Sequence, residues 1–188
     1  MASDNFQKIC AVVDAQGFQF NDKFIPREVA VVSDYISQCQ ELNCKIKWNE
    51  LTEQEQAIII YSKNYVHGLH YLPFNHKYFC YIYDYKDIGK LLTMWYEMIA
   101  TEERPYFAYK NYQLGKILNE INIPAIDLDN KELNFLTVEE LQKKYKDNYL
   151  CAFHKRSMNS NKILTCALRK SAHIYREIKS RLNNETME

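Results

Sequence analysis

The sequence contains little glycine or proline and no long hydrophobic run. Its 188 residues include only four glycines and four prolines, which argues against collagen-like and low-complexity disordered chains. No stretch of about 18 consecutive apolar residues is present, so we expect no transmembrane helix. Hydrophobic residues still make up 47% of the chain and aromatic residues 14%, enough to bury one sizeable core. We therefore expect a single domain over residues 1–183, followed by a disordered tail at 184–188.

The first eight residues lack the apolar core of a secretory signal peptide. We therefore expect a cytoplasmic or nuclear protein whose six cysteines are reduced. In such a protein, cysteines are first considered as buried apolar residues, metal ligands or nucleophiles, and only then as disulfide partners.

Charge is balanced overall but divided unevenly along the chain. Residues 1–150 carry 16 basic and 21 acidic side chains, whereas residues 151–188 carry 8 basic and 3 acidic ones. A basic segment of this kind can form a surface that binds nucleic-acid phosphates, or it can be an ordinary solvated helix face. The composition leaves both interpretations open.

Hydrophobic patterning predicts alternating strands and helices. Two strands, at residues 9–13 and 24–32, should pair as a hairpin across a turn at 21–23, with Pro26 at an edge or a bulge. Further strands are expected at 78–83, 106–109 and 125–128, and helices at 49–62, 87–102, 114–119, 138–145 and 164–182. The stretch 57–61 could equally be strand. This order predicts an α/β fold with a mixed sheet flanked by helices, and it suits a ribonuclease H-like core.

The strongest local motif is Cys151-Ala152-Phe153-His154, followed by Cys166 at the start of the last predicted helix. A Cys-x2-His turn can bring a thiolate and an imidazole to one ion, and a third soft ligand can arrive from the adjoining helix. A carboxylate is an acceptable fourth ligand of zinc. The alternative is that Cys151 and Cys166 are ordinary buried cysteines and His154 a surface residue. In contrast, Cys39 and Cys44 lie in a polar segment where we expect no ligand partners.

A second group of potential ligands lies in the middle of the chain. It consists of His67, His70, His76 and Cys80. These residues could bind a metal ion or place a general base in a loop. We favour the alternative that the histidines satisfy hydrogen bonds in a loop, since no carboxylate partner lies nearby in the sequence.

A metal-dependent nuclease would need several carboxylates around a shared pair of ions about 4 Å apart. Asp14, at the end of the first predicted strand, is suitably placed, but the usual acidic partner two residues later is Gln16. Glu28 is the only carboxylate in the second strand region. Four other aspartates are more simply explained as turn or cap residues: Asp84, Asp87, Asp127 and Asp129. The sequence therefore predicts no complete acidic set.

Several of these segments resemble the Maelstrom domain of the small-RNA (piRNA) silencing pathway of animal germ cells. Residues 24–32, FIPREVAVV, are similar to that family's Pro-x-Glu-Ile-Ala-Val-Val strand. The Cys-x2-His motif at 151–154, with Cys-Ala-Leu at 166–168 and Tyr175 downstream, is similar to the family's pattern. Residues 68–73, GLHYLP, are similar to a family loop with His before Leu-Pro. The matches are scattered between about residues 11 and 178.

The resemblance implies a ribonuclease H-like fold of the DEDD-exonuclease kind whose acidic active site is largely lost. It also implies a structural zinc ion held by Glu28, Cys151, His154 and Cys166. The expected function is single-stranded RNA binding in RNA silencing, with silencing-pathway proteins as further partners, in a free-standing relative from a mobile element or virus. The alternative is a ribonuclease: a metal-dependent DEDD-type 3′–5′ exonuclease or an RNA endonuclease.

The last predicted helix offers a surface for RNA. Arg169, His173 and Arg176 recur at steps of four and three residues, which places them on one side of the helix, opposite its apolar stripe. Three further basic residues precede the helix: Lys155, Arg156 and Lys162. Together they could contact successive phosphates. The alternative is again a solvated helix face.

Overall fold

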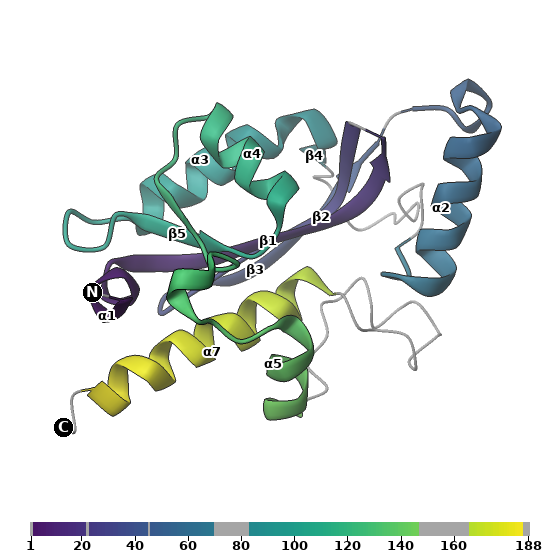
Figure 1. Cartoon of the computed structure of the whole chain (residues 1–188). Coiled ribbons are helices and arrows are strands. Elements are labelled where there is room, and N and C mark those ends of the chain that lie inside the picture. The colour runs from purple at the N-terminus through teal and green to yellow at the C-terminus, as the bar shows by residue number, and fades with distance from the viewer. Residues whose placement is uncertain (1, 22, 45, 70–82, 147–165, 186–188) are drawn as a thin grey trace.

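A computed structural model describes residues 2–21, 23–44, 46–69, 83–146 and 166–185 (Figure 1). Its centre is a six-stranded sheet of order β4-β3-β2-β1-β5-β6. The strands are β1 (Ile9–Phe20), β2 (Lys23–Ser33), β3 (Ser37–Asn43), β4 (Tyr83–Asp84), β5 (Tyr106–Tyr109) and β6 (Ala125–Asp127). Pairing is antiparallel in β1–β2 and β2–β3 and parallel in β1–β5, β5–β6 and β3–β4. The predicted mixed sheet is confirmed.

Helices cover both faces of this sheet. They are α1 (Ala2–Gln7), α2 (Glu53–Tyr65), α3 (Ile88–Ile99), α4 (Tyr112–Glu120), α5 (Val138–Lys144) and α7 (Ala167–Glu185). Short 3-10 turns occupy Trp48–Glu50, Tyr85–Asp87 and Lys131–Leu133. In Figure 1, α3 and α4 lie above the sheet, α5 and α7 below it, and α2 beyond the far end of the β1–β2 hairpin.

The alternation of side chains along the central strands builds a separate core on each face. Val12 on β1 packs in the same cluster as Ile174 of α7. Its neighbour Val13 packs in the opposite cluster, with Leu92 and Trp95 of α3. Successive residues of a strand point to opposite faces. In the central part of β1 and β2, the parity of a residue therefore decides whether it meets α7 or α3.

A bulge interrupts the β1–β2 hairpin near Pro26. The register passes from Gln16 opposite Glu28 to Gly17 opposite Pro26, which leaves Arg27 as the extra residue. A Cβ atom on Gly17 would collide with the backbone carbonyl of Ile25, so the close approach of the two strands requires glycine. Arg27 is fully buried. Of the two alternatives expected at Pro26, an edge or a bulge, the structure has the bulge.

Two helices begin at the capping boxes expected from the sequence. Thr52 with Glu55 caps α2, and Thr137 with Glu140 caps α5. The ambiguous stretch 57–61 is helical. Among the described residues, no helix is long and apolar enough to cross a membrane.

Several details differ from the sequence-based expectations. Helix α1 was not predicted, and the first strand runs on to Phe20. Helix α7 continues to Glu185, so the tail does not begin at residue 184 as expected. Strand β3 was not predicted, because its residues alternate poorly between polar and apolar. The strand expected at 78–83 lies outside the described residues except for Tyr83, which begins β4.

Candidate zinc site and nucleic-acid surface

Two buried carboxylates lie on the face of the sheet that α7 covers. Asp14 on β1 shares the parity of Val12, and Glu28 on β2 shares that of Ala30, which packs in the α7-side cluster. Both carboxylates have no exposed surface. In the strand register Asp14 lies opposite Ala30, and Gln16 lies opposite Glu28. The carboxylates are therefore diagonal neighbours across β1 and β2.

Asp14 is held by two side chains, one for each of its carboxylate oxygens. The Lys170 ammonium lies 2.9 Å from Oδ1, and the amide of Gln16 donates a 2.8 Å hydrogen bond to Oδ2. Burial raises the pKa of Asp14 above its ordinary value, while the Lys170 charge acts in the opposite direction. A buried carboxylate needs a compensating partner, and here the partner is a protein cation.

Glu28 lies beside two thiols. Cys39 of β3 donates a hydrogen bond of 3.0 Å to Glu28 Oε1. The Sγ of Cys166, immediately before α7, lies 3.5 Å from the same oxygen, although the two residues are 138 positions apart in the chain. Two of the four predicted zinc ligands, Glu28 and Cys166, are thus brought together. The expectation that Cys39 has no partner at the site is wrong.

The separation of Glu28 and Cys166 suits shared coordination of zinc. With Zn–S of about 2.3 Å, Zn–O of about 2.0–2.2 Å and a tetrahedral angle, the two donor atoms should lie about 3.5–3.7 Å apart. The observed Oε1 to Sγ distance of 3.5 Å falls in this range, and it is also the distance of a hydrogen bond from the Cys166 thiol to the carboxylate. Cys151 and His154 lie outside the described residues. Within the described ranges, no three His, Cys, Asp or Glu side chains form a metal-binding group, so the complete set stays a prediction.

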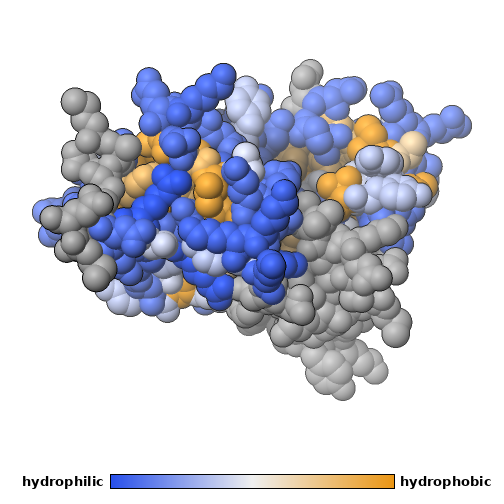
Figure 2. All heavy atoms as spheres, turned by 60° about the horizontal axis from the view of Figure 1, so that its bottom comes forward, coloured by the Kyte–Doolittle hydropathy of each residue, from blue (hydrophilic) through white to orange (hydrophobic). Residues whose placement is uncertain are grey.

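The surface expected to bind RNA is only partly exposed. His173 is 2% exposed and its ring centroid lies 5.6 Å from that of Tyr145, the residue that ends α5. The expectation that His173 lies on an open helix face is wrong, because α5 packs against this side of α7. Arg176 is exposed, and Arg169 is partly buried beside a small pocket between α5 and α7. Figure 2 shows mainly hydrophilic residues on this side of the molecule.

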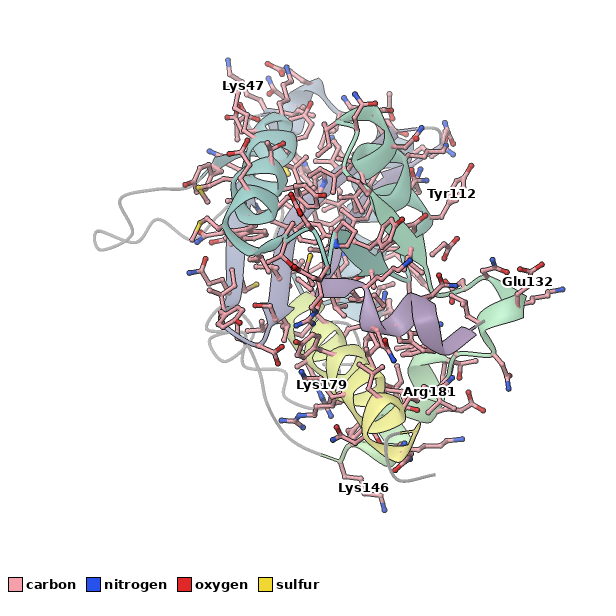
Figure 3. The ribbon with its side chains drawn as sticks, turned by 90° about the vertical axis from the view of Figure 1, so that its left-hand side faces the viewer. Lys47, Tyr112, Glu132, Lys146, Lys179 and Arg181 are labelled. Carbon is pink, nitrogen blue, oxygen red and sulfur yellow. The ribbon has the colours of Figure 1, made fainter. Side chains whose placement is uncertain are left out.

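Much of the positive charge of α7 is balanced within the fold. Lys179 pairs with Asp34 at 2.9 Å, and Arg181 pairs with Glu177 at 3.1 Å. Figure 3 shows Lys179 and Arg181 on different sides of the helix. Lys170 is paired with Asp14, as described above. Of the residues predicted to contact phosphates, Arg169, His173 and Arg176 are described, and Arg176 is the exposed one. Lys155, Arg156 and Lys162 lie outside the described residues.

His67 is the described member of the histidine group, and it has the structural role that was expected. His67 is buried, its Nε2 lies 3.0 Å from the carbonyl oxygen of Gly17, and its Nδ1 accepts a hydrogen bond from the backbone of Leu69. His70, His76 and Cys80 lie outside the described residues. His67 therefore stabilises the end of the hairpin.

The four additional aspartates also have local roles. Asp84 and Asp127 accept hydrogen bonds from backbone amides two residues later, as turn and cap residues do. The other two form ion pairs with lysines: Asp87 with Lys90 and Asp129 with Lys110. None of these contacts adds a carboxylate to Asp14 and Glu28.

Sequence reasoning missed two members of the site, Lys170 and Cys39. The register of β3 against β2, which carries Cys39 to Glu28, was not predicted. Lys170 follows Cys166 by one helical turn, and this spacing could have suggested that both reach the same face of the sheet. Comparisons with protein-family models, curated proteins and solved structures found no match for this chain.

Proposed function

We propose that this chain is a zinc-stabilised, ribonuclease H-like domain of the Maelstrom kind that binds single-stranded RNA in RNA silencing and does not cleave it by magnesium chemistry. The observation that carries the proposal is the position of Glu28 Oε1, 3.5 Å from Cys166 Sγ. Both residues belong to the zinc set that the sequence resemblance implies.

The strand order supports the ribonuclease H-like part of the proposal. β3, β2 and β1 form an antiparallel unit, and β5 and β6 extend it with parallel strands. Helices pack on both faces, with α7 crossing the face that carries Asp14 and Glu28. In such an arrangement the carboxylates of the central strands lie under the last helix.

The proposed ligands are Glu28, Cys151, His154 and Cys166. When bound, zinc supplies a structural cross-link, and its binding free energy contributes directly to folding. Glu28 belongs to the middle of the sheet and Cys166 to the start of α7. Their shared role is to hold the start of α7 against β2.

The surroundings of Asp14 favour a binding domain over a nuclease. A two-metal nuclease uses carboxylate oxygens to hold cations. Here Lys170 and Gln16 bind the two oxygens of Asp14, and a glutamine stands where a second acid would be needed. The Lys170 ammonium already compensates the charge that a divalent cation would otherwise compensate.

RNA binding is proposed from charge. Residues 151–188 carry 8 basic and 3 acidic side chains, and Arg176 is exposed on α7. Arginine contacts to phosphates supply sequence-independent affinity that depends on salt. Arg169 and Arg176 would contact the backbone of the strand, together with Lys155, Arg156 and Lys162.

Elemental analysis, combined with RNA binding and degradation assays, tests this function. The purified protein should contain about one zinc per chain, as expected for a single structural site. It should bind a labelled single-stranded RNA and leave the RNA intact both with and without magnesium. RNA degradation that requires magnesium and is lost in Asp14→Asn would support the exonuclease instead. Protein without zinc and without RNA affinity would refute the proposal.

A further inference from the structure

A further thiol, that of Cys39, lies next to the two proposed zinc ligands Glu28 and Cys166. Cys39 donates its thiol hydrogen to Glu28 Oε1 at 3.0 Å, and the thiol of Cys166 lies 3.5 Å from the same oxygen. Cys39 is partly buried and packs against the cluster between the sheet and α7. The Glu-Cys-His-Cys set does not include it.

We propose that Cys39 is a positioning residue of the zinc site, which orients the carboxylate of Glu28 through a thiol hydrogen bond. The inference rests on the proposed zinc site and deepens it. Ligating carboxylates are themselves held by hydrogen bonds, and loss of such a partner typically weakens metal binding about 10–100-fold.

The distances separate the roles of the two thiols. Two ligands of one tetrahedral zinc ion, a sulfur and an oxygen, should lie about 3.5–3.7 Å apart. Cys166 meets this value with its 3.5 Å separation from Oε1. Both separations lie within hydrogen-bonding distance for a thiol, but the 3.0 Å of Cys39 is too short for a sulfur and an oxygen that share one tetrahedral zinc ion. Cys39 therefore acts on the metal through Glu28.

The strand register explains how Cys39 reaches this position. Cys39 lies opposite Ala30, and Glu41 lies opposite Glu28, so Cys39 is a diagonal neighbour of Glu28 on the same face. A slip by one residue would turn Cys39 to the opposite face of the sheet. The hydrogen bond is consequently built into the pairing of β2 and β3.

Zinc affinity in a set of Cys39 variants tests the inference. Cys39→Ala and Cys39→Val remove the donor. Valine is somewhat larger than cysteine, so it leaves no cavity, and it suits a strand. Cys39→Ser keeps a donor. Cys44→Ala is the matched control, because Cys44 is a buried thiol in a separate cluster with Phe18 and Ile25. The dissociation constant of zinc is measured by competition with a chromophoric chelator, and folding is checked by circular dichroism.

We expect zinc binding about 10–100-fold weaker in Cys39→Ala and Cys39→Val, and near-parental in Cys39→Ser and Cys44→Ala. The stoichiometry should stay unchanged. If Cys39→Ala does not fold, Cys39→Val is compared with Cys39→Ser instead. Parental affinity in the folded variants without a donor, or a serine variant as weak as valine, would overturn the assignment.

Cobalt substitution distinguishes a positioning residue from a ligand. The sulfur-to-cobalt charge-transfer absorption should fall in Cys166→Ser and keep its intensity in cobalt-saturated Cys39→Val. A fall in Cys39→Val would make Cys39 a ligand and overturn the positioning role. A parent protein that binds neither zinc nor cobalt would instead refute the proposed function itself.

Discussion

The ammonium of Lys170 lies 2.9 Å from the carboxylate of Asp14, in contact between α7 and the middle of β1. Asp14 has no exposed surface, and the Lys170 side chain is 12% exposed. The cost of removing both charges from water largely offsets their attraction, so the intact pair adds little net stability. Loss of one partner, however, leaves a buried charge without compensation and destabilises the fold. Substitution of either residue should therefore weaken the packing of α7 on the sheet.

Lys170→Met should destabilise the protein by about 3 kcal/mol, because the Asp14 charge would remain buried without its cation. Urea unfolding at neutral pH measures this loss. In the double variant Lys170→Met with Asp14→Asn, the uncompensated charge is removed, so stability should partly recover. A double variant at least as unstable as Lys170→Met alone would contradict the argument.

Removal of zinc should lower the melting temperature by many degrees, since a structural metal contributes its binding free energy to folding. Cys166→Ser should lower it as well and should abolish the further effect of a chelator. Cys10→Ser is the control, because Cys10 packs in the cluster on the opposite face of the sheet. This variant should keep its zinc and its sensitivity to chelator. Unchanged melting and zinc content in Cys166→Ser would remove Cys166 from the site.

Arg169→Glu with Arg176→Glu should weaken single-stranded RNA binding strongly. Because Arg169 is partly buried, circular dichroism checks that the double variant is folded. Each lost phosphate contact should reduce the slope of log affinity against log salt by about 0.7. Fluorescence anisotropy across a salt titration measures both effects.

The control for this RNA prediction is Lys90→Glu with Lys116→Glu, which reverses the charge of two lysines on the other face of the sheet. It changes the net charge equally, and both residues lie on α3 and α4, away from α7. Equal weakening by the two double variants would mean that net charge alone governs binding. Unaltered binding by the α7 variant would assign its arginines to a solvated face.

Acid should release a second ionic contact of α7, between Asp34 and Lys179. Slight burial opposes ionisation, but hydrogen bonds from Lys179 and Arg104 lower the pKa of Asp34 from 3.8 to about 2. A carboxyl with a depressed folded-state pKa stabilises the fold above its ordinary pKa, and this stabilisation is lost as pH falls through the folded-state value.

We therefore expect Asp34→Asn to lose a small part of the parent's stability at pH 5 and above, and the difference to shrink between about pH 4 and pH 2. Urea unfolding of the two proteins over this range measures it. A difference that stays constant with pH would show that the Asp34 charge does not stabilise the fold.

Local patterns in the sequence predicted the parts of the fold that depend on short-range chemistry. Thr52 and Thr137, each followed three residues later by glutamate, located the starts of two helices because a capping box is complete within four residues. Pro26 predicted an edge or a bulge because proline cannot donate to the strand ladder, and the structure has the bulge. Residue type and family resemblance alone led to the prediction of zinc ligands in the Cys-x2-His motif and at Glu28.

Tertiary structure decided which distant residues meet. The polar strand β3 has no period of its own, and its pairing with β2 places Cys39 beside Glu28. Helix α5 buries His173, although the periodicity of α7 places this residue opposite the apolar stripe. Lys170 compensates Asp14 across 156 positions of the chain. Periodicity describes only one element, whereas burial and charge pairing depend on the neighbour that packs against it.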